Sequence, residues 1–232
     1  MLKELRGAVW EANMLLSRSG LAPGTWGNAS GIDRERGIVA IKASGVPYER
    51  MTAGMIVLVD LEGRVVSGDL KPSSDTPTHI VLYRAFPHIG GVAHTHSQAA
   101  TAFAQACRPI PCLGTTHADH FDGDVPVTRF LNSGETAGDY EAATGKVIVE
   151  TFTAAQVDPM RVPAVLVAGH GPFTWGKDAR DAVENAIALE AVAAMALGTL
   201  SLSGGSVNRI PDYLLRKHFD RKHGPGAYYG QR

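Results

Sequence analysis

Cysteine is scarce in this chain of 232 residues, which contains only Cys107 and Cys112. Their spacing matches neither a CxxC motif nor a disulfide framework, so the sequence predicts a reducing, cytoplasmic compartment. A surplus of charge is also lacking, because 22 Lys and Arg residues stand against 23 Asp and Glu residues. The net charge of −1 gives no electrostatic reason to expect nucleic-acid binding or attachment to a membrane surface.

Long apolar runs and glycine-rich cofactor motifs are lacking as well. The N-terminal segment, MLKELRGAVWEANMLL, is interrupted by charges and is not a secretion signal, and no stretch is expected to span a bilayer. No strand leads into GxGxxG, and the GKV at 145–147 has neither the spacing nor the hydroxyl residue of a P-loop. The sequence therefore predicts neither a dinucleotide site nor a P-loop nucleotide site.

What remains predicts one α/β domain over residues 1–232, without repeats or linkers. Helices are expected at about 2–16, from 75 or 76 onward, and at about 97–107, 134–153 and 178–200. A strand that runs into a turn is expected over 37–45, a strand at 90–95, two strands joined by a turn over 163–176, and a hairpin over 55–69. Because many strands connect through hairpins, the central sheet should be largely antiparallel.

Three histidines and one aspartate suggest a metal site. His94 and His96 are one residue apart at the end of a predicted strand, so both side chains leave the same face. His170 follows another strand and lies between two glycines, and Asp75 stands at a predicted helix start. Zinc accepts imidazole and carboxylate ligands, and manganese or another divalent ion is an alternative. Each residue also has an ordinary reading, as a polar strand face, a turn histidine or a helix cap.

Three turns could bind a phosphate group. TWGNASG (25–31), IKASG (41–45) and KPSSD (71–75) each place Ser, Asn or Lys beside Gly or Pro. Such turns expose backbone N–H groups that can surround an anion. Three ordinary loops would look the same, so each turn alone is weak support.

These stretches together resemble a known family. TWGNASGIDRERGIVAIKASGV, KPSSDTPTHIVLYRAFPHIGGVAHTHS, GTTHADHF, GHGPFTWGKDA and KHGPGAYYGQ are similar, in this order, to the L-ribulose-5-phosphate 4-epimerases of the class II aldolase/epimerase superfamily. The resemblance implies a three-layer α/β/α sandwich around a mostly antiparallel central sheet. It also implies one bound zinc per subunit, a sugar-phosphate substrate, and a homotetramer with active sites at subunit interfaces.

The resemblance also assigns roles to residues. It implies that Asp119 and, from the adjacent subunit, Tyr229 are the catalytic acid/base pair. From the residues alone, Asp119 could instead be a loop carboxylate bonded to its own backbone, and Tyr228 or Tyr229 could anchor the tail, a role that suits Tyr228 better. The implied metal ligands are Asp75, His94, His96 and His170. The implied phosphate contacts are Asn28, Lys42, Ser44, Gly45, Ser73 and Ser74, and further polar site positions are Thr116, Glu141 and His218. The chain departs from the family pattern at Ala43, where the epimerases carry proline, and in LVAGHG, where they have LVHSHG.

The implied reaction is inversion at C4 of L-ribulose 5-phosphate, which gives D-xylulose 5-phosphate. C4 is β to the C2 carbonyl, so its hydrogen is not acidic, and no nicotinamide motif supports oxidation and re-reduction. Retro-aldol cleavage of C3–C4 and re-formation of the bond remain.

Three alternatives stay open at this point. A class II aldolase such as L-fuculose-phosphate aldolase would release the aldehyde, but those enzymes carry Glu where Asp75 stands. A paralogous epimerase could serve a sugar pathway other than arabinose catabolism. A non-catalytic scaffold module, as in adducin heads, would be expected to lack the metal-binding histidines.

Overall fold

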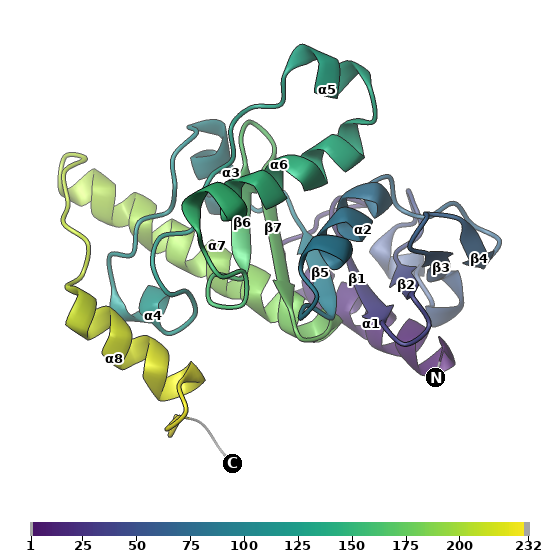
Figure 1. The fold of residues 1–232 in the computed structure, drawn as a ribbon, viewed down its shortest axis with the longest axis horizontal. Coiled ribbons are helices and arrows are strands. Elements are labelled where there is room, and N and C mark those ends of the chain that lie inside the picture. Colours follow the sequence, from purple (N-terminus) through teal and green to yellow (C-terminus); the bar gives the residue numbers. More distant parts are fainter. Residues whose placement is uncertain (1, 230–232) are drawn as a thin grey trace.

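Seven short strands form one sheet in the order β4-β3-β2-β1-β5-β7-β6 (Figure 1). The structure is a computed structural model that describes residues 2–229. The strands are β1 (Asn28–Asp33), β2 (Ile38–Ile41), β3 (Val57–Asp60), β4 (Val65–Ser67), β5 (Gly91–His94), β6 (Ala164–Val167) and β7 (Gly171–Gly176). All neighbouring strands pair antiparallel, which confirms the predicted sheet type.

Helices cover both faces of this sheet. They are α1 (Leu2–Arg18), α2 (Thr76–Ala85), α3 (Gln98–Gln105), α4 (Thr115–Ala118), α5 (Ser133–Ala137), α6 (Tyr140–Ala155), α7 (Ala179–Leu202) and α8 (Asp212–His223), with 3-10 turns η1 (Tyr48–Arg50) and η2 (Ala53–Met55). On one face, α1 and the first half of α7 pack on Ala40 and Ala93. On the other, α2 and α6 pack on Val39 and Val92. The alternation of buried side chains along the strands thus produces the predicted three-layer α/β/α sandwich.

Three elements differ from the sequence-based expectation. Residues 28–33 form a central strand, although NASGID consists largely of turn-forming residues, because β2 and β5 pair with its two edges. The helix expected over 134–153 is divided at Gly138, after which the Asp139 carboxylate accepts a hydrogen bond from the Ala142 amide and caps α6. Helix α8 lies in the polar C-terminal segment for which no helix was predicted.

Helix α7 corrects the expectation that no stretch could span a membrane. By length and composition alone, its 24 residues meet that criterion. In the fold, however, α7 packs against β7, β5, α1 and α3. Its buried side chains, including Val183 and Leu189, belong to the core. The position of α7 behind the sheet therefore explains part of its apolar composition (Figure 1), whereas Met195, Leu197 and Leu202 toward its end are exposed.

Candidate active site and metal centre

The three predicted histidine ligands converge at one end of the central strands. His94 ends β5, His96 follows two residues later, and His170 lies in the turn between β6 and β7. One ligand atom from each ring lies within 4.8 Å of the others. Gly171 is required for this approach, because a Cβ there would lie 2.7 Å from the carbonyl oxygen of Thr95. The folded chain thus brings together the side chains that the sequence could only suggest as neighbours.

The ring orientations fit a tetrahedral metal ion. His94 donates from Nδ1 to the Pro172 carbonyl oxygen at 3.0 Å, which leaves Nε2 free as a ligand. This Nε2 lies 3.1 Å from Nε2 of His96. Two nitrogens bound to one tetrahedral zinc ion at about 2.0–2.1 Å would lie roughly 3.3 Å apart. The donor set and its spacing therefore suit a divalent metal.

Burial keeps two of the rings, those of His96 and His170, in the form that binds metals. The pKa of His170 is lowered to about 4, mainly by burial and also by the neighbouring His94 and His96. Burial is also the main cause of the lowered pKa of His96. A metal binds imidazole in its neutral form. These two rings are already neutral near neutral pH, so no proton has to leave before a metal binds. The Tyr140 hydroxyl lies 3.3 Å from Nδ1 of His170 and can fix the orientation of that ring.

Asp75 lies beside the histidines but outside their compact group. Its carboxylate does not cap α2; instead, Oδ2 accepts a 2.6 Å hydrogen bond from the Asn28 amide. Burial acts to raise the pKa of Asp75, but the nearby His94 and His79, and the bond from Asn28, bring it below its usual value. Asp75 therefore remains a carboxylate that faces the same cavity as the histidines.

All six predicted phosphate contacts line that cavity, which has a volume of about 680 Å³. They are Asn28, Lys42, Ser44, Gly45, Ser73 and Ser74, and Glu141 lines it as well. Two backbone bonds join the second and third turns, from the Ser44 amide to the Lys71 carbonyl and from the Ser73 amide to the Lys42 carbonyl. The side-chain amide of Asn28, in the first turn, donates to Oγ of Ser73 at 3.1 Å. The three turns are thus one site, which the sequence could not establish.

Lys42 is a buried cation without a counter-ion. It is 2% exposed, and burial lowers its pKa. Its ammonium lies 3.3 Å from the Ala43 carbonyl and 4.9 Å from the centroid of the Tyr48 ring. Among residues 2–229 no carboxylate forms an ion pair with it. An anion in the cavity would supply the missing charge.

Asp119 and Tyr229 do not line this cavity. Asp119, at the end of α4, accepts hydrogen bonds from Nε of Arg221 at 2.9 Å and Nδ1 of His218 at 3.0 Å. Burial opposes ionisation of Asp119, yet Arg221 and His218 lower its pKa below the usual value. The Arg221 guanidinium also lies 4.8 Å from the centroid of the Tyr229 ring. Thr116 is on α4 but lines a different cavity, beside Met195.

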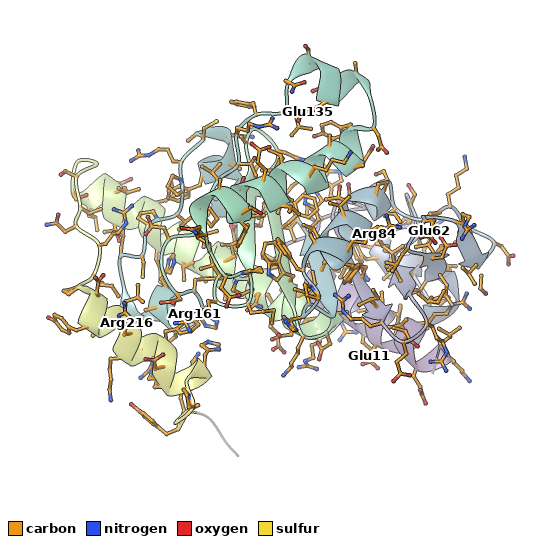
Figure 2. All side chains as sticks on the ribbon, viewed as in Figure 1. Glu11, Glu62, Arg84, Glu135, Arg161 and Arg216 are labelled. Carbon is orange, nitrogen blue, oxygen red and sulfur yellow. The ribbon has the colours of Figure 1, made fainter. Side chains whose placement is uncertain are left out.

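This cluster bears on the expected arrangement of subunits. The resemblance implied that Asp119 and Tyr229 come from adjacent subunits, and that arrangement stays a prediction; within one chain, both residues contact Arg221. The helix α8 that carries the cluster is held by Arg161, whose guanidinium lies 4.7 Å from the Phe219 ring and which pairs with Asp122. Figure 1 shows α4 and α8 together at the lower left, away from β5 and α2, and Figure 2 shows Arg161 beside α8.

Sequence reasoning missed residues in both of these clusters. Trp26 and Tyr140 line the metal-centred cavity, and Arg221 joins Asp119 to Tyr229. Trp26 and Tyr140 lie next to or near predicted site residues in the chain, and that proximity was the available signal. For Arg221 there was no signal, because α8 was not predicted.

The fold is that of a class II aldolase-type protein, and the chain belongs to that family. Residues 7–197 match the family model described as Class II Aldolase and Adducin N-terminal domain. The L-ribulose-5-phosphate 4-epimerases UlaF of Salmonella paratyphi A and Salmonella typhi are each 55% identical to this chain over 231 residues, covering 100% of both sequences. These relatives confirm the predicted resemblance.

Solved structures agree on the fold. An L-fuculose 1-phosphate aldolase superposes with a TM-score of 0.77 at 25% identity, covering 94% of this chain and 95% of the aldolase. YgbL of Klebsiella pneumoniae, a putative aldolase/epimerase/decarboxylase, gives a TM-score of 0.71 at 26% identity, with coverages of 92% and 97%.

Proposed function

We propose that this protein is an L-ribulose-5-phosphate 4-epimerase, which interconverts L-ribulose 5-phosphate and D-xylulose 5-phosphate. The observation that carries the proposal is that one cavity contains two groups of residues. One group is the three converging histidines, and the other is the buried, unpaired Lys42 among serine-containing turns. The first suits a metal that binds the ketose oxygens, and the second suits the phosphate. The full-length identity of 55% to proteins named as this epimerase supports the same substrate. Residues 1–232 would then act as one class II aldolase/epimerase domain.

The reaction follows from the substrate's chemistry. A base removes the proton of the C4 hydroxyl, the C3–C4 bond breaks, and its electrons pass to the C2 carbonyl. The products of this step are the enediolate of dihydroxyacetone and glycolaldehyde phosphate. When bound, a divalent metal supplies Lewis-acid stabilisation of the negative charge on the C2 and C3 oxygens. Lys42 and the serine turns retain the phosphate while the aldehyde turns over, and re-formation of the bond inverts C4.

The metal proposed for the site is Zn²⁺, one per subunit, with Mn²⁺ or another divalent ion as the alternative. His94, His96 and His170 would hold it, together with Asp75. Three imidazoles and one carboxylate are a donor set that zinc accepts, and the 3.1 Å separation of two ligand nitrogens supports this choice.

Asp119 and Tyr229 are the proposed proton shuttles, acting on opposite C4 configurations. Their cluster lies outside the metal-centred cavity of its own chain, so they would serve the cavity of a neighbouring subunit. A homotetramer with active sites at its interfaces satisfies this need. His218 and Arg221 would hold Asp119 in place, and Thr116 and Glu141 would supply further polar contacts. We further infer a cytoplasmic location, to which the two unpaired cysteines are suited.

Product analysis tests the epimerase against the aldolase. Zinc-loaded protein is given L-ribulose 5-phosphate, and the products are separated. D-xylulose 5-phosphate is the expected product. Net accumulation of dihydroxyacetone and glycolaldehyde phosphate would instead establish an aldolase. Asp75 favours the epimerase, since the aldolases resemble this chain but carry the longer glutamate there.

A further inference from the structure

The buried side chain of His79 has no role in the reaction described so far. His79 is 0% exposed on α2, and its backbone amide donates to the carbonyl of Asp75, one turn earlier. Asp75, His79 and Tyr83 follow one another at intervals of four, so they lie along one face of the helix. This row faces β1, where Asn28 bonds Asp75 and Ser30 bonds both His79 and Tyr83. His79 is therefore buried behind Asp75 and does not itself line the metal-centred cavity.

The hydroxyl groups beside His79 fix its tautomer. Ser30 Oγ lies 2.7 Å from Nδ1 of His79 and 2.8 Å from the hydroxyl of Tyr83. Only one direction gives both hydroxyl protons an acceptor: Tyr83 donates to Ser30, and Ser30 donates to Nδ1. Because Nδ1 accepts the proton of Ser30, the proton of the ring itself is on Nε2.

Within residues 2–229, this Nε2–H group has no hydrogen-bond partner although it is buried. A buried donor without an acceptor costs about 1–3 kcal/mol, so native proteins rarely retain one without a reason. The titratable neighbours that act on the ring are Asp75 and His94. Its edge also contacts Phe173, which stacks on His94 at 4.1 Å. The unsatisfied donor is thus at the base of the proposed metal site.

We propose that His79 is a positioning residue for Asp75. Asn28 occupies Oδ2 of that carboxylate, and no described residue donates to Oδ1. When the carboxylate turns one oxygen toward the metal, the Nε2–H of His79 holds the other oxygen. Metal-binding carboxylates usually have such a partner, which sets their orientation. The inference rests on the proposed metal site but goes beyond it, because it assigns a role to the Tyr83–Ser30–His79 chain.

Zinc affinity tests the role directly. Apo-protein competes with a chromophoric chelator for Zn²⁺, and the His79→Gln variant is expected to bind zinc about 10- to 100-fold more weakly. His88→Gln is the matched control, because His88 is exposed just beyond the other end of α2. In an Asp75→Ala background, His79→Gln should cost almost nothing further, since its partner is gone. An equal loss in both backgrounds would overturn the proposal.

A second measurement does not depend on a stable His79 variant. In the wild-type apo-protein, nitrogen-15 NMR of the histidine rings should show the Nε2–H tautomer for His79. Tyr83→Phe should weaken that preference and reduce zinc affinity by less than His79→Gln does. An Nδ1–H tautomer in the wild type would contradict the argument. Failure of the wild-type protein to bind zinc would remove the proposed metal site itself, whereas wild-type binding that His79→Gln leaves unchanged would remove only the role of His79.

Discussion

Replacement of Lys42 by methionine tests the proposed phosphate site most sharply. Methionine keeps much of the length of the side chain and removes only the ammonium group. A hydrogen bond to a charged group contributes about 1.5–3 kcal/mol, so the loss should raise KM by about 10- to 150-fold. The phosphate is distant from the bond that breaks, and it is held alike in the ground state and in the transition state. The change should therefore appear mainly in KM, with a smaller effect on kcat.

The assay is steady-state conversion of L-ribulose 5-phosphate, coupled to detection of D-xylulose 5-phosphate. Lys71→Met is the control, because Lys71 is exposed and contributes its backbone carbonyl to the same pair of turns. Thermal unfolding completes the test. Lys42→Met removes a buried, unpaired charge, so the unliganded variant should unfold at a temperature no lower than that of the wild type. An unchanged KM in a folded variant would refute the reasoning.

Three further predictions address the proposed acid/base cluster and the core. Asp119→Asn should leave the zinc content intact but sharply lower kcat, and near-normal turnover would remove Asp119 from the mechanism. Mixed oligomers of Asp119→Asn and His94→Asn chains should recover activity, because the two substitutions lie in different clusters. Mixed oligomers of Asp119→Asn and Tyr229→Phe chains should not, because Asp119 and Tyr229 share one cluster. Recovery of activity in the second mixture would contradict this grouping. The pKa of His79 is about 3, well below the usual 6.5, so its contribution to apo-protein stability is present above pH 6.5 and declines as the pH falls toward 3. The decline is at most about 1.4 kcal/mol per pH unit, and acid unfolding of His79→Gln should be correspondingly less steep.

The sequence predicted the elements whose apolar periodicity is strong. The helix at 2–16, the strand that ends at His94 and the long helix before residue 200 are all present, because burial on the sheet requires that pattern. It missed β1, whose polar and glycine residues become a strand only through pairing with β2 and β5. It also missed α8, which has a strongly polar composition and only one buried side chain, Phe219.

The residues of the candidate site were likewise predictable only in part. His94 and His96 could be paired from strand geometry, since side chains two residues apart share a face. The approach of His170, and the union of three separate turns around Lys42, depend on sheet order and on close backbone contacts such as that at Gly171. Sequence spacing carries no information of that kind. The placement of Asp119 with Tyr229 depends on α8, and an element that was not predicted could not position its residues.

The arrangement around Arg221 suits a reaction that runs in both directions. In the proposed mechanism, one shuttle removes a proton from the C4 hydroxyl and the other returns a proton to the opposite face of the aldehyde. Each turnover therefore moves one negative charge between Asp119 and Tyr229, while their combined charge stays the same. The Arg221 guanidinium donates to the Asp119 carboxylate and lies over the Tyr229 ring, so it faces both positions of that charge. The Lys222 ammonium also lies 4.8 Å from the centroid of the Tyr229 ring. Two cations therefore adjoin the tyrosine, and one of them, Arg221, also binds the aspartate, so the negative charge has a cation beside it in either position.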